Sequence, residues 1–367
     1  MRKTHLIRWG MLLTLGAGLM TAELRAGDAP AARPPVTVAE SALDGCKIKI
    51  AVPANWNGTL LLLAHGRWSE DAPLTAEMFE TEEPCRSLLA DGWMIAATSY
   101  RRNGWIVDEA MLDLDALQNH VAAKYGAPKR VFLYGKSMGG LIAVKMAERQ
   151  PPTLAGAAAN CPAMDPVRDT ALLPRIPIVL VYTHNETKAS FAYSSHLKPG
   201  SVPMAFRTVK RDGHCNTNGQ EELAVLRDLA ARVDTGKIEM LRDVTFTPLP
   251  VVSTAEFRDG RASAAVTEVA TAFGNLKTAF VPADLERLGI KPGARFRLEA
   301  GDQSPTVLFG TGYGDVPKGE WVAFFDADGR FILARNFANA AAQLGCRAGD
   351  KVSLKANIEH STSNIQH

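Results

Sequence analysis

The most constraining feature of this sequence is a short apolar run that ends in a glycine-flanked serine. Residues 131–134 are apolar, Gly135-Lys136-Ser137-Met138-Gly139 follows directly, and residues 138–149 have a helical apolar pattern. A serine on a strand-to-helix turn adopts a strained backbone, and flanking glycines let neighbouring chain pass without Cβ clashes. The segment therefore predicts a buried strand, a sharp turn that presents Ser137, and a helix.

The chain around this turn alternates short apolar runs with amphipathic stretches from about residue 47 to residue 234. Residues 108–125 carry apolar side chains at three- and four-residue spacing, which places one helix face against a sheet. The segments that we expect to form strands are 47–52, 59–64, 94–98, 131–134, 154–159, 178–182 and 204–209. This alternation predicts an α/β fold with a mostly parallel sheet and helices on both faces.

After Gly236 the pattern changes to short β-type segments separated by glycine and proline. A chain of 367 residues also exceeds the usual size of one domain. We therefore expect a catalytic α/β domain at 40–236, a linker at 237–256 and a smaller β-rich, barrel-like domain at 257–356. The polar residues 357–367 are expected to form a disordered tail.

Composition and charge indicate a soluble globular protein and argue against a nucleic-acid partner. Hydrophobic residues make up 46% of the chain and charged residues 22%, as in soluble globular proteins. The formal net charge is only +2, without a long basic run, so no nucleic-acid partner is expected. Small or neutral substrates remain open.

The N-terminus has the pattern of an export signal. Arg2, Lys3 and Arg8 precede the apolar run 9–20, and small residues follow at positions where cleavage could occur. We expect a signal peptide at 1–26, a periplasmic or secreted protein, and no integral membrane span in the mature form. An uncleaved membrane anchor is the alternative, although the run is short against the ~20 residues of a span.

Five cysteines occur, all after the expected signal peptide. Oxidising conditions outside the cytosol permit disulfides, and Cys46 with Cys85 and Cys161 with Cys215 are the pairs that the expected fold suggests. Buried free thiols are the alternative. No CxxC spacing indicates zinc, and we expect neither a metal nor an organic cofactor.

A serine hydroxyl needs a general base, and in this architecture the chain order is serine, acid, histidine. His214 follows the last predicted strand of the α/β region and precedes its closing helix, so it is the expected base. Glu186, just past the strand 178–182, is the expected acid. Asp165 is its competitor, and Asp212 is interpreted as a turn residue.

Two backbone N–H groups are expected to stabilise a developing oxyanion. One belongs to Met138, the residue after the nucleophile, at the N-terminus of a helix. The other lies in the turn after strand 59–64, at Arg67 or Trp68. His65 in the same turn is interpreted as a structural hydrogen-bonding residue.

Residues 47–236 resemble the α/β-hydrolase superfamily, through the His65-Gly66 turn, the Ser137 elbow and the His214 loop. The resemblance implies hydrolysis of an ester, thioester, amide or related bond. We expect a serine hydrolase that cleaves a small-molecule carboxylic ester through an acyl-enzyme on Ser137. A peptidase or amidase with the same triad is the alternative.

Residues 259–354 resemble the C-terminal domain of S-adenosylmethionine hydroxide adenosyltransferases and fluorinases. The resemblance rests on four ordered motifs: Phe273-Gly274-Asn275-Leu276, 284–289, Tyr313-Gly314-Asp315-Val316-Pro317 and Ala334-Arg335-Asn336. It implies adenosine contacts from Asn275, Tyr313 and Arg335, and a possible homo-oligomer, since family members are trimers.

The N-terminal domain that completes the pocket in that family is replaced here by a hydrolase. The alternative to adenosine binding is therefore a structural role, in which the barrel serves in packing or assembly or covers the Ser137 site. A nucleoside-binding or assembly protein with a degenerate hydrolase domain is the alternative of a different class.

Overall fold

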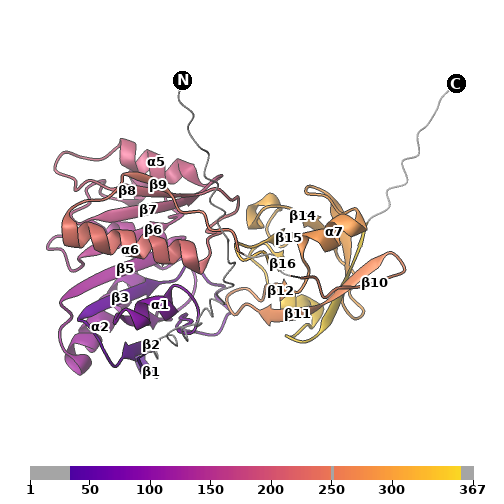
Figure 1. The fold of residues 1–367 in the computed structure, drawn as a ribbon, viewed down its shortest axis with the longest axis horizontal. Coiled ribbons are helices and arrows are strands. Elements are labelled where there is room, and N and C mark those ends of the chain that lie inside the picture. The colour runs from indigo at the N-terminus through magenta and orange to yellow at the C-terminus, as the bar shows by residue number, and fades with distance from the viewer. Residues whose placement is uncertain (1–33, 249–251, 357–367) are drawn as a thin grey trace, which may run out of the picture. The chain divides into compact units, whose positions relative to one another are not determined.

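The computed structural model describes residues 34–248 and 252–356, which lie in one compact unit. They form two sheets, one in the N-terminal and one in the C-terminal part of the chain (Figure 1). The predicted signal peptide at 1–26 and the predicted tail at 357–367 lie outside the described residues. Among the residues described, no helix is long and apolar enough to cross a membrane.

The first sheet has nine strands in the order β1-β2-β4-β3-β5-β6-β7-β8-β9. β2 pairs antiparallel with β1 and β4, and every other neighbouring pair is parallel. This confirms the predicted, mostly parallel α/β sheet. The strands are β1 (Val36–Leu43), β2 (Cys46–Pro53), β3 (Thr59–Ala64), β4 (Met94–Thr98), β5 (Arg130–Lys136), β6 (Gly156–Asn160), β7 (Ile178–Thr183), β8 (Ala205–Val209) and β9 (Leu241–Asp243).

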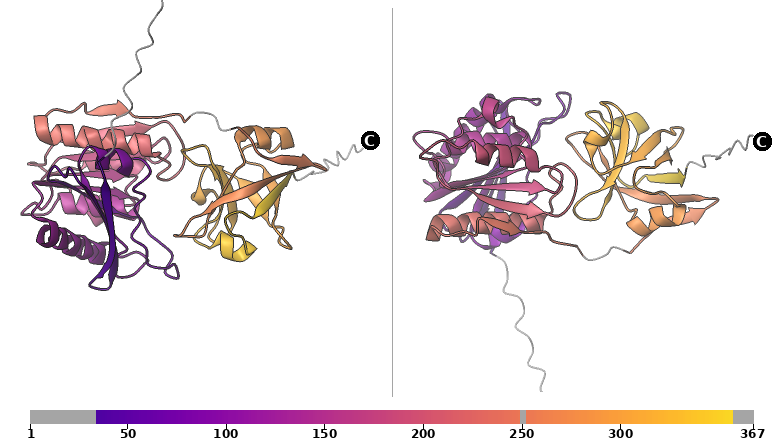
Figure 2. Two further views of the ribbon diagram at one scale, coloured as in Figure 1. Left: turned by 60° about the horizontal axis from the view of Figure 1, so that its bottom comes forward. Right: turned by 90° about the horizontal axis from the view of Figure 1, so that it is seen from above.

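Helices cover both faces of this sheet (Figures 1 and 2). Alternate side chains of β3 show the division, because Leu60 and Leu62 join the core with α2 and α3, whereas Leu61 joins the core with α1 and α6. Neighbouring side chains of a strand point to opposite faces, so the single apolar run of β3 contributes side chains to both cores. The helices are α1 (Cys85–Ala90), α2 (Val107–Tyr125), α3 (Met138–Ala147), α4 (Pro166–Asp169), α5 (Thr187–Ser195) and α6 (Gly219–Thr235).

Both edge strands of the sheet lie outside the segments predicted as strands. β1 is mostly exposed, with polar residues interrupting its apolar ones, and β9 is a three-residue strand within the stretch expected to be a linker. An exposed edge strand buries little apolar surface, so its sequence lacks the apolar run by which the inner strands were recognised.

The second sheet closes into a barrel, as the sequence predicted. Seven strands form a ring in the order β11-β12-β16-β15-β14-β13-β17, which the pairing of β17 with β11 closes, and β10 pairs with β11 outside the ring. The elements are β10 (Glu256–Arg258), β11 (Arg261–Val269), β12 (Leu276–Thr278), α7 (Pro282–Leu288), β13 (Arg295–Glu299), β14 (Thr306–Phe309), η1 (Tyr313–Asp315), β15 (Trp321–Phe325), β16 (Phe331–Arg335), α8 (Ala340–Leu344) and β17 (Lys351–Ala356).

All five cysteines are free thiols. The disulfides Cys46–Cys85 and Cys161–Cys215 are therefore not present, and the alternative of free thiols holds. Burial raises the pKa of Cys46 to about 11 and that of Cys85 to about 12, so both thiols stay protonated at neutral pH.

Candidate active site

Ser137 lies on a tight turn between β5 and α3. Its backbone φ is +56°, in the region that only a few per cent of residues other than glycine adopt. A Cβ atom at Gly135 would overlap the carbonyl oxygen of Gly139, and one at Gly139 would overlap the carbonyl oxygen of Ala64. The two glycines are therefore required by close backbone packing, which brings the end of β3 against the turn.

His214 meets Ser137 from a loop that joins β8 to α6. Its Nε2 atom lies 2.8 Å from Ser137 Oγ, a normal hydrogen-bond distance. Gly213, with φ +106°, precedes it, and the Gly213 N–H donates to Asn185 Oδ1 at 3.0 Å. Parallel strands end at the same edge of the sheet, so the residues after β5 and β8 can meet although they are far apart in the chain.

Glu186 follows β7 at the same edge and approaches the other ring nitrogen of His214. Its Oε2 atom lies 3.3 Å from His214 Nδ1. Among the described residues, Asp212 contacts His184 Nδ1 at 3.1 Å, and the competitor Asp165 makes no hydrogen bond or ion pair with the imidazole. The structure therefore aligns Glu186, His214 and Ser137 in that order.

The surroundings of His214 act on its pKa in opposite directions. Removal of water by the surrounding protein lowers the pKa, whereas the hydrogen bond and the negative charge of Glu186 raise it, together with the charge of Cys161. The net direction is upward from the ordinary value. The imidazole is thus suited to accept a proton, because its charged form is stabilised by Glu186.

The turn after β3 lies beside the nucleophile. A Cβ atom at Gly66 would be 3.3 Å from Ser137 Cβ, which places the Gly66–Arg67 segment next to the hydroxyl. Met138 is the first residue of α3, so its N–H has no acceptor within the helix. Of the two predicted oxyanion residues, Met138 therefore follows Ser137 directly, and Arg67 follows the glycine that lies beside the Ser137 side chain.

His65 is packed as a structural residue. Its ring stacks on Tyr100 with 4.1 Å between centroids, and its Nδ1 atom lies 2.7 Å from Gly66 O. Burial lowers the pKa of His65 to about 4, despite the opposing effect of its backbone hydrogen bonds. The ring is neutral near pH 7 and orders the turn between β3 and Arg67.

A polar link between the Ser137 turn and the His214 loop was missed by the sequence reasoning. Lys136 Nζ lies 2.5 Å from Glu222 Oε1, which also accepts a hydrogen bond from Thr217 Oγ1 at 2.9 Å. Burial lowers and the Glu222 carboxylate raises the pKa of Lys136, with a net rise, so the ion pair persists. No local sequence signal connects these residues.

The barrel residues predicted to contact adenosine form contacts with one another or with the barrel itself. Asn275 Nδ2 donates to Tyr313 Oη at 3.0 Å, and Asn275 Oδ1 is buried without a hydrogen-bond partner among the described residues. Arg335 lies over the Trp321 ring and donates to Gly319 O at 3.0 Å. Asn275 and Tyr313 thus adjoin, whereas Arg335 is held by a separate set of contacts.

Comparison with known families gives two matches. Residues 102–223 match the model of the serine aminopeptidase family S33, and residues 270–353 match the model of the SAM hydroxide adenosyltransferase C-terminal domain. The two matches indicate a region similar to α/β-hydrolases followed by a barrel similar to the SAM hydroxide adenosyltransferase C-terminal domain. The first match covers both Ser137 and His214, and the N-terminal region has the mostly parallel sheet of the α/β-hydrolase fold.

Curated proteins yield no match to this sequence. Among solved structures, an uncharacterised conserved protein from Thermotoga maritima matches at 22% identity and TM-score 0.27, over 35% of this chain and 49% of that one. Dipeptidyl peptidase 4 from Porphyromonas gingivalis matches at 12% identity and TM-score 0.42, over 55% and 36%. A putative dienelactone hydrolase from Klebsiella pneumoniae matches at 14% identity and TM-score 0.44, over 55% and 99%. This chain thus spans about half of the first protein and about a third of the second.

Proposed function

We propose that the protein is a serine hydrolase that cleaves small carboxylic esters through an acyl-enzyme on Ser137. The observation that carries the proposal is the contact of Ser137 Oγ with His214 Nε2 at 2.8 Å, backed by Glu186 at His214 Nδ1. Among residues 34–248 and 252–356, no group of three or more His, Cys, Asp or Glu side chains that could hold a metal ion occurs.

In the proposed reaction, His214 Nε2 takes the Ser137 proton while Oγ attacks the ester carbonyl carbon. The N–H groups of Met138 and Arg67 stabilise the oxyanion of the tetrahedral intermediate. His214 then returns the proton to the departing alcohol, which leaves the acyl group on Ser137. Water, deprotonated by His214, attacks the acyl-enzyme and releases the acid. Glu186 stabilises the imidazolium that forms in both halves.

A fluorophosphonate probe and a series of p-nitrophenyl esters of graded acyl length test this proposal. The probe should label the full-length protein once, at Ser137, and the label should be absent from Ser137→Ala. At least one ester should be hydrolysed, with release of p-nitrophenol. A folded wild-type protein that neither reacts with the probe nor cleaves any ester would contradict the proposal.

Amide cleavage is the nearest alternative, and the match of residues 102–223 to a serine aminopeptidase family favours it. Both reactions use the same serine and base, but an amide needs the acid form of His214 to protonate a poorer leaving group. Aminoacyl p-nitroanilides and p-nitrophenyl esters with the same acyl group separate the two. A higher kcat/KM for the anilide would assign the protein to the peptidases.

We also propose that the protein is exported through its N-terminal segment, on the strength of the basic and apolar pattern of residues 1–26. Expression of the full chain followed by fractionation and N-terminal sequencing tests this. The expected result is a mature protein that begins after residue 22 and lies outside the cytosol. An intact N-terminus in the cytosolic fraction would contradict it.

A second candidate function, nucleoside binding by the barrel, is favoured by the buried Oδ1 atom of Asn275, which has no hydrogen-bond partner in the part of the chain that the structure describes. Such an acceptor could take a hydrogen bond from an exocyclic amine, with Tyr313 as an aromatic neighbour. The contact between Asn275 and Tyr313 favours the alternative, a barrel kept for packing or assembly. Isothermal titration with adenosine and S-adenosylmethionine decides between them, and absence of heat at millimolar ligand would exclude binding.

A further inference from the structure

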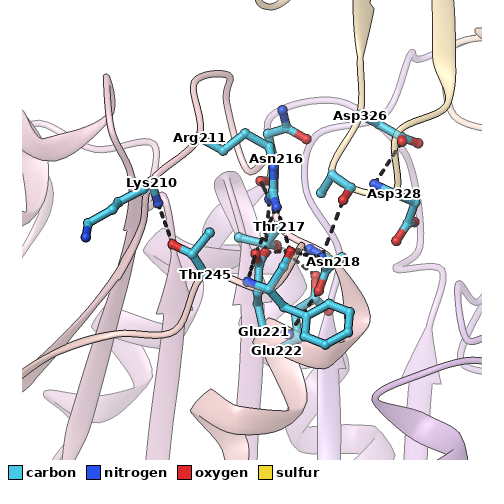
Figure 3. A network of polar contacts seen from close by, with 12 residues as sticks. Lys210, Arg211, Asn216, Thr217, Asn218, Glu221, Glu222, Thr245, Asp326 and Asp328 are labelled. Carbon is cyan, nitrogen blue, oxygen red and sulfur yellow. Dashed lines mark hydrogen bonds and ion pairs between the residues drawn. The ribbon is translucent and has the colours of Figure 1, made fainter. Parts of the chain in front are cut away.

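The loop that carries His214, residues 211–218, is held by a buried ion pair at its base. Arg211 Nη1 and Nη2 donate to Glu221 Oε2 and Oε1 at 3.1 and 3.0 Å. The Glu221 side chain is only 1% exposed. Figure 3 shows Arg211 at the start of the loop and Glu221 in the first turn of α6. Two parallel hydrogen bonds between a guanidinium and a carboxylate fix orientation as well as distance.

Glu221 uses its remaining acceptor capacity on two backbone N–H groups. Its Oε2 atom accepts from Asn218 at 2.8 Å, and its Oε1 atom accepts from Phe246 at 2.8 Å. Asn218 ends the His214 loop, whereas Phe246 belongs to the segment that leads toward the barrel. Each carboxylate oxygen therefore accepts two hydrogen bonds from protein donors.

Arg211 closes the loop on itself. Besides Glu221, it donates to Asn216 O at 2.9 Å and to Phe246 O at 3.1 Å. The Asn216 side chain donates to Asp212 O at 2.8 Å. The residues before and after His214 are thus tied to each other, so the position of the imidazole depends on this set of contacts.

The same set of contacts includes the barrel. Asn218 Nδ2 donates to Phe246 O at 3.0 Å and to Ala327 O at 3.4 Å. Figure 3 shows this contact reaching the turn that carries Asp326 and Asp328. Glu221 therefore contacts the His214 loop and the segment at Phe246 directly, and Asn218 extends these contacts to a turn of the barrel.

We propose that Glu221 is a positioning residue that holds His214 at Ser137 and couples this position to the connection with the barrel. The proposal deepens the proposed function and rests on it. A carboxylate is needed at this site because each of its oxygens accepts two hydrogen bonds. In Glu221→Gln, an NH₂ group would replace one oxygen and would face two hydrogen-bond donors. Misplacement of a catalytic group by about 1 Å costs about a hundredfold in rate.

The chain contains a matched control on the same two elements. Arg207 Nε, on β8, lies 2.5 Å from Asp228 Oδ2, on α6, and Arg207 is 1% exposed. This ion pair also joins β8 to α6, but Asp228 contacts Arg207 and Arg242 and makes no hydrogen bond to residues 211–218. Loss of Asp228 should weaken helix packing without moving His214.

The experiment compares Glu221→Gln with Asp228→Asn in the full-length protein. Both should lower the melting temperature, because Glu221→Gln leaves the partly buried Arg211, and Asp228→Asn the buried Arg207, without a carboxylate partner. Glu221→Gln should lower kcat for p-nitrophenyl esters by about ten- to a hundredfold with KM within about threefold. Asp228→Asn should keep kcat within about twofold of the wild type. Equal losses in both variants, or an unchanged kcat in Glu221→Gln, would overturn the proposal.

A second measurement does not depend on turnover. NMR titration of the His214 ring should give a lower pKa in Glu221→Gln than in the wild type, because the contact with Glu186 loosens, and no change in Asp228→Asn. An unchanged His214 pKa in Glu221→Gln contradicts positioning. If the wild type neither hydrolyses esters nor reacts with the fluorophosphonate probe, the proposed function fails, and this titration still decides the role of Glu221.

Discussion

Polar side chains are arranged differently in the two regions of this protein. At the carboxyl edge of the nine-stranded sheet, His214 and Glu186 are 35% and 37% exposed, and they face a hydroxyl on a strained turn. In the barrel, Asn275 is 7% exposed and bonds to Tyr313, whose pKa burial raises to about 12. A reactive site keeps groups available to a substrate, whereas a packed interior pairs them with each other.

The strongest way to sharpen this comparison is to remove the hydroxyl of Ser137. Ser137→Ala should lower kcat for esters by about 10⁴-fold or more, because it removes the proposed nucleophile. The folded state should be unaffected, since the hydrogen bond to His214 is the only one that Ser137 Oγ makes among the described residues. Steady-state kinetics and circular dichroism check both statements, and residual turnover above about 1% would assign the nucleophile to another residue.

Glu186→Gln should have the next largest effect, a loss of about a hundredfold or more in kcat. Glu186 raises the pKa of His214, and hydrolysis needs the neutral imidazole, so activity of the wild type rises with pH through this raised pKa. Without the carboxylate the acid limb of kcat/KM should move to lower pH. A pH profile from 5 to 9 measures this, and a limb that stays in place or moves upward would contradict the role of Glu186.

Tyr313→Phe probes the other side of the comparison. It removes the acceptor of the Asn275 amide, which is then buried without a partner, at a cost of about 1–3 kcal/mol. Thermal unfolding should show a melting temperature lower by several degrees, with ester turnover within about twofold of the wild type. A tenfold loss of kcat at unchanged stability would instead place Tyr313 in the hydrolytic site.

The smallest effect is expected for Asp165→Asn. Asp165 follows β6 but makes no hydrogen bond to His214 among the described residues, so kcat and the pH profile should remain within about twofold of the wild type. The variant carries the same chemical change as Glu186→Gln. An equal loss of activity in both variants would contradict the assignment of Glu186 as the acid that orients His214.

Local sequence patterns were sufficient to predict much of the fold. The inner strands were predicted because each is an apolar run, and the Ser137 turn because its glycines are required where backbone segments touch. The exposed β1 and the short β9 carry no such run. The α/β sheet and the C-terminal barrel were confirmed, while the predicted site residues and domain limits stay predictions that the proposed variants test.

The sequence by itself determined which residue types stand at the ends of β5, β7 and β8, because turns and periodicity depend on neighbours in the chain. Only the tertiary structure decided between Glu186 and Asp165 as the neighbour of His214, and only it joined Arg211 to Glu221. These contacts depend on how parallel strands and α6 pack in space, and the distances that packing creates are not encoded in any short segment.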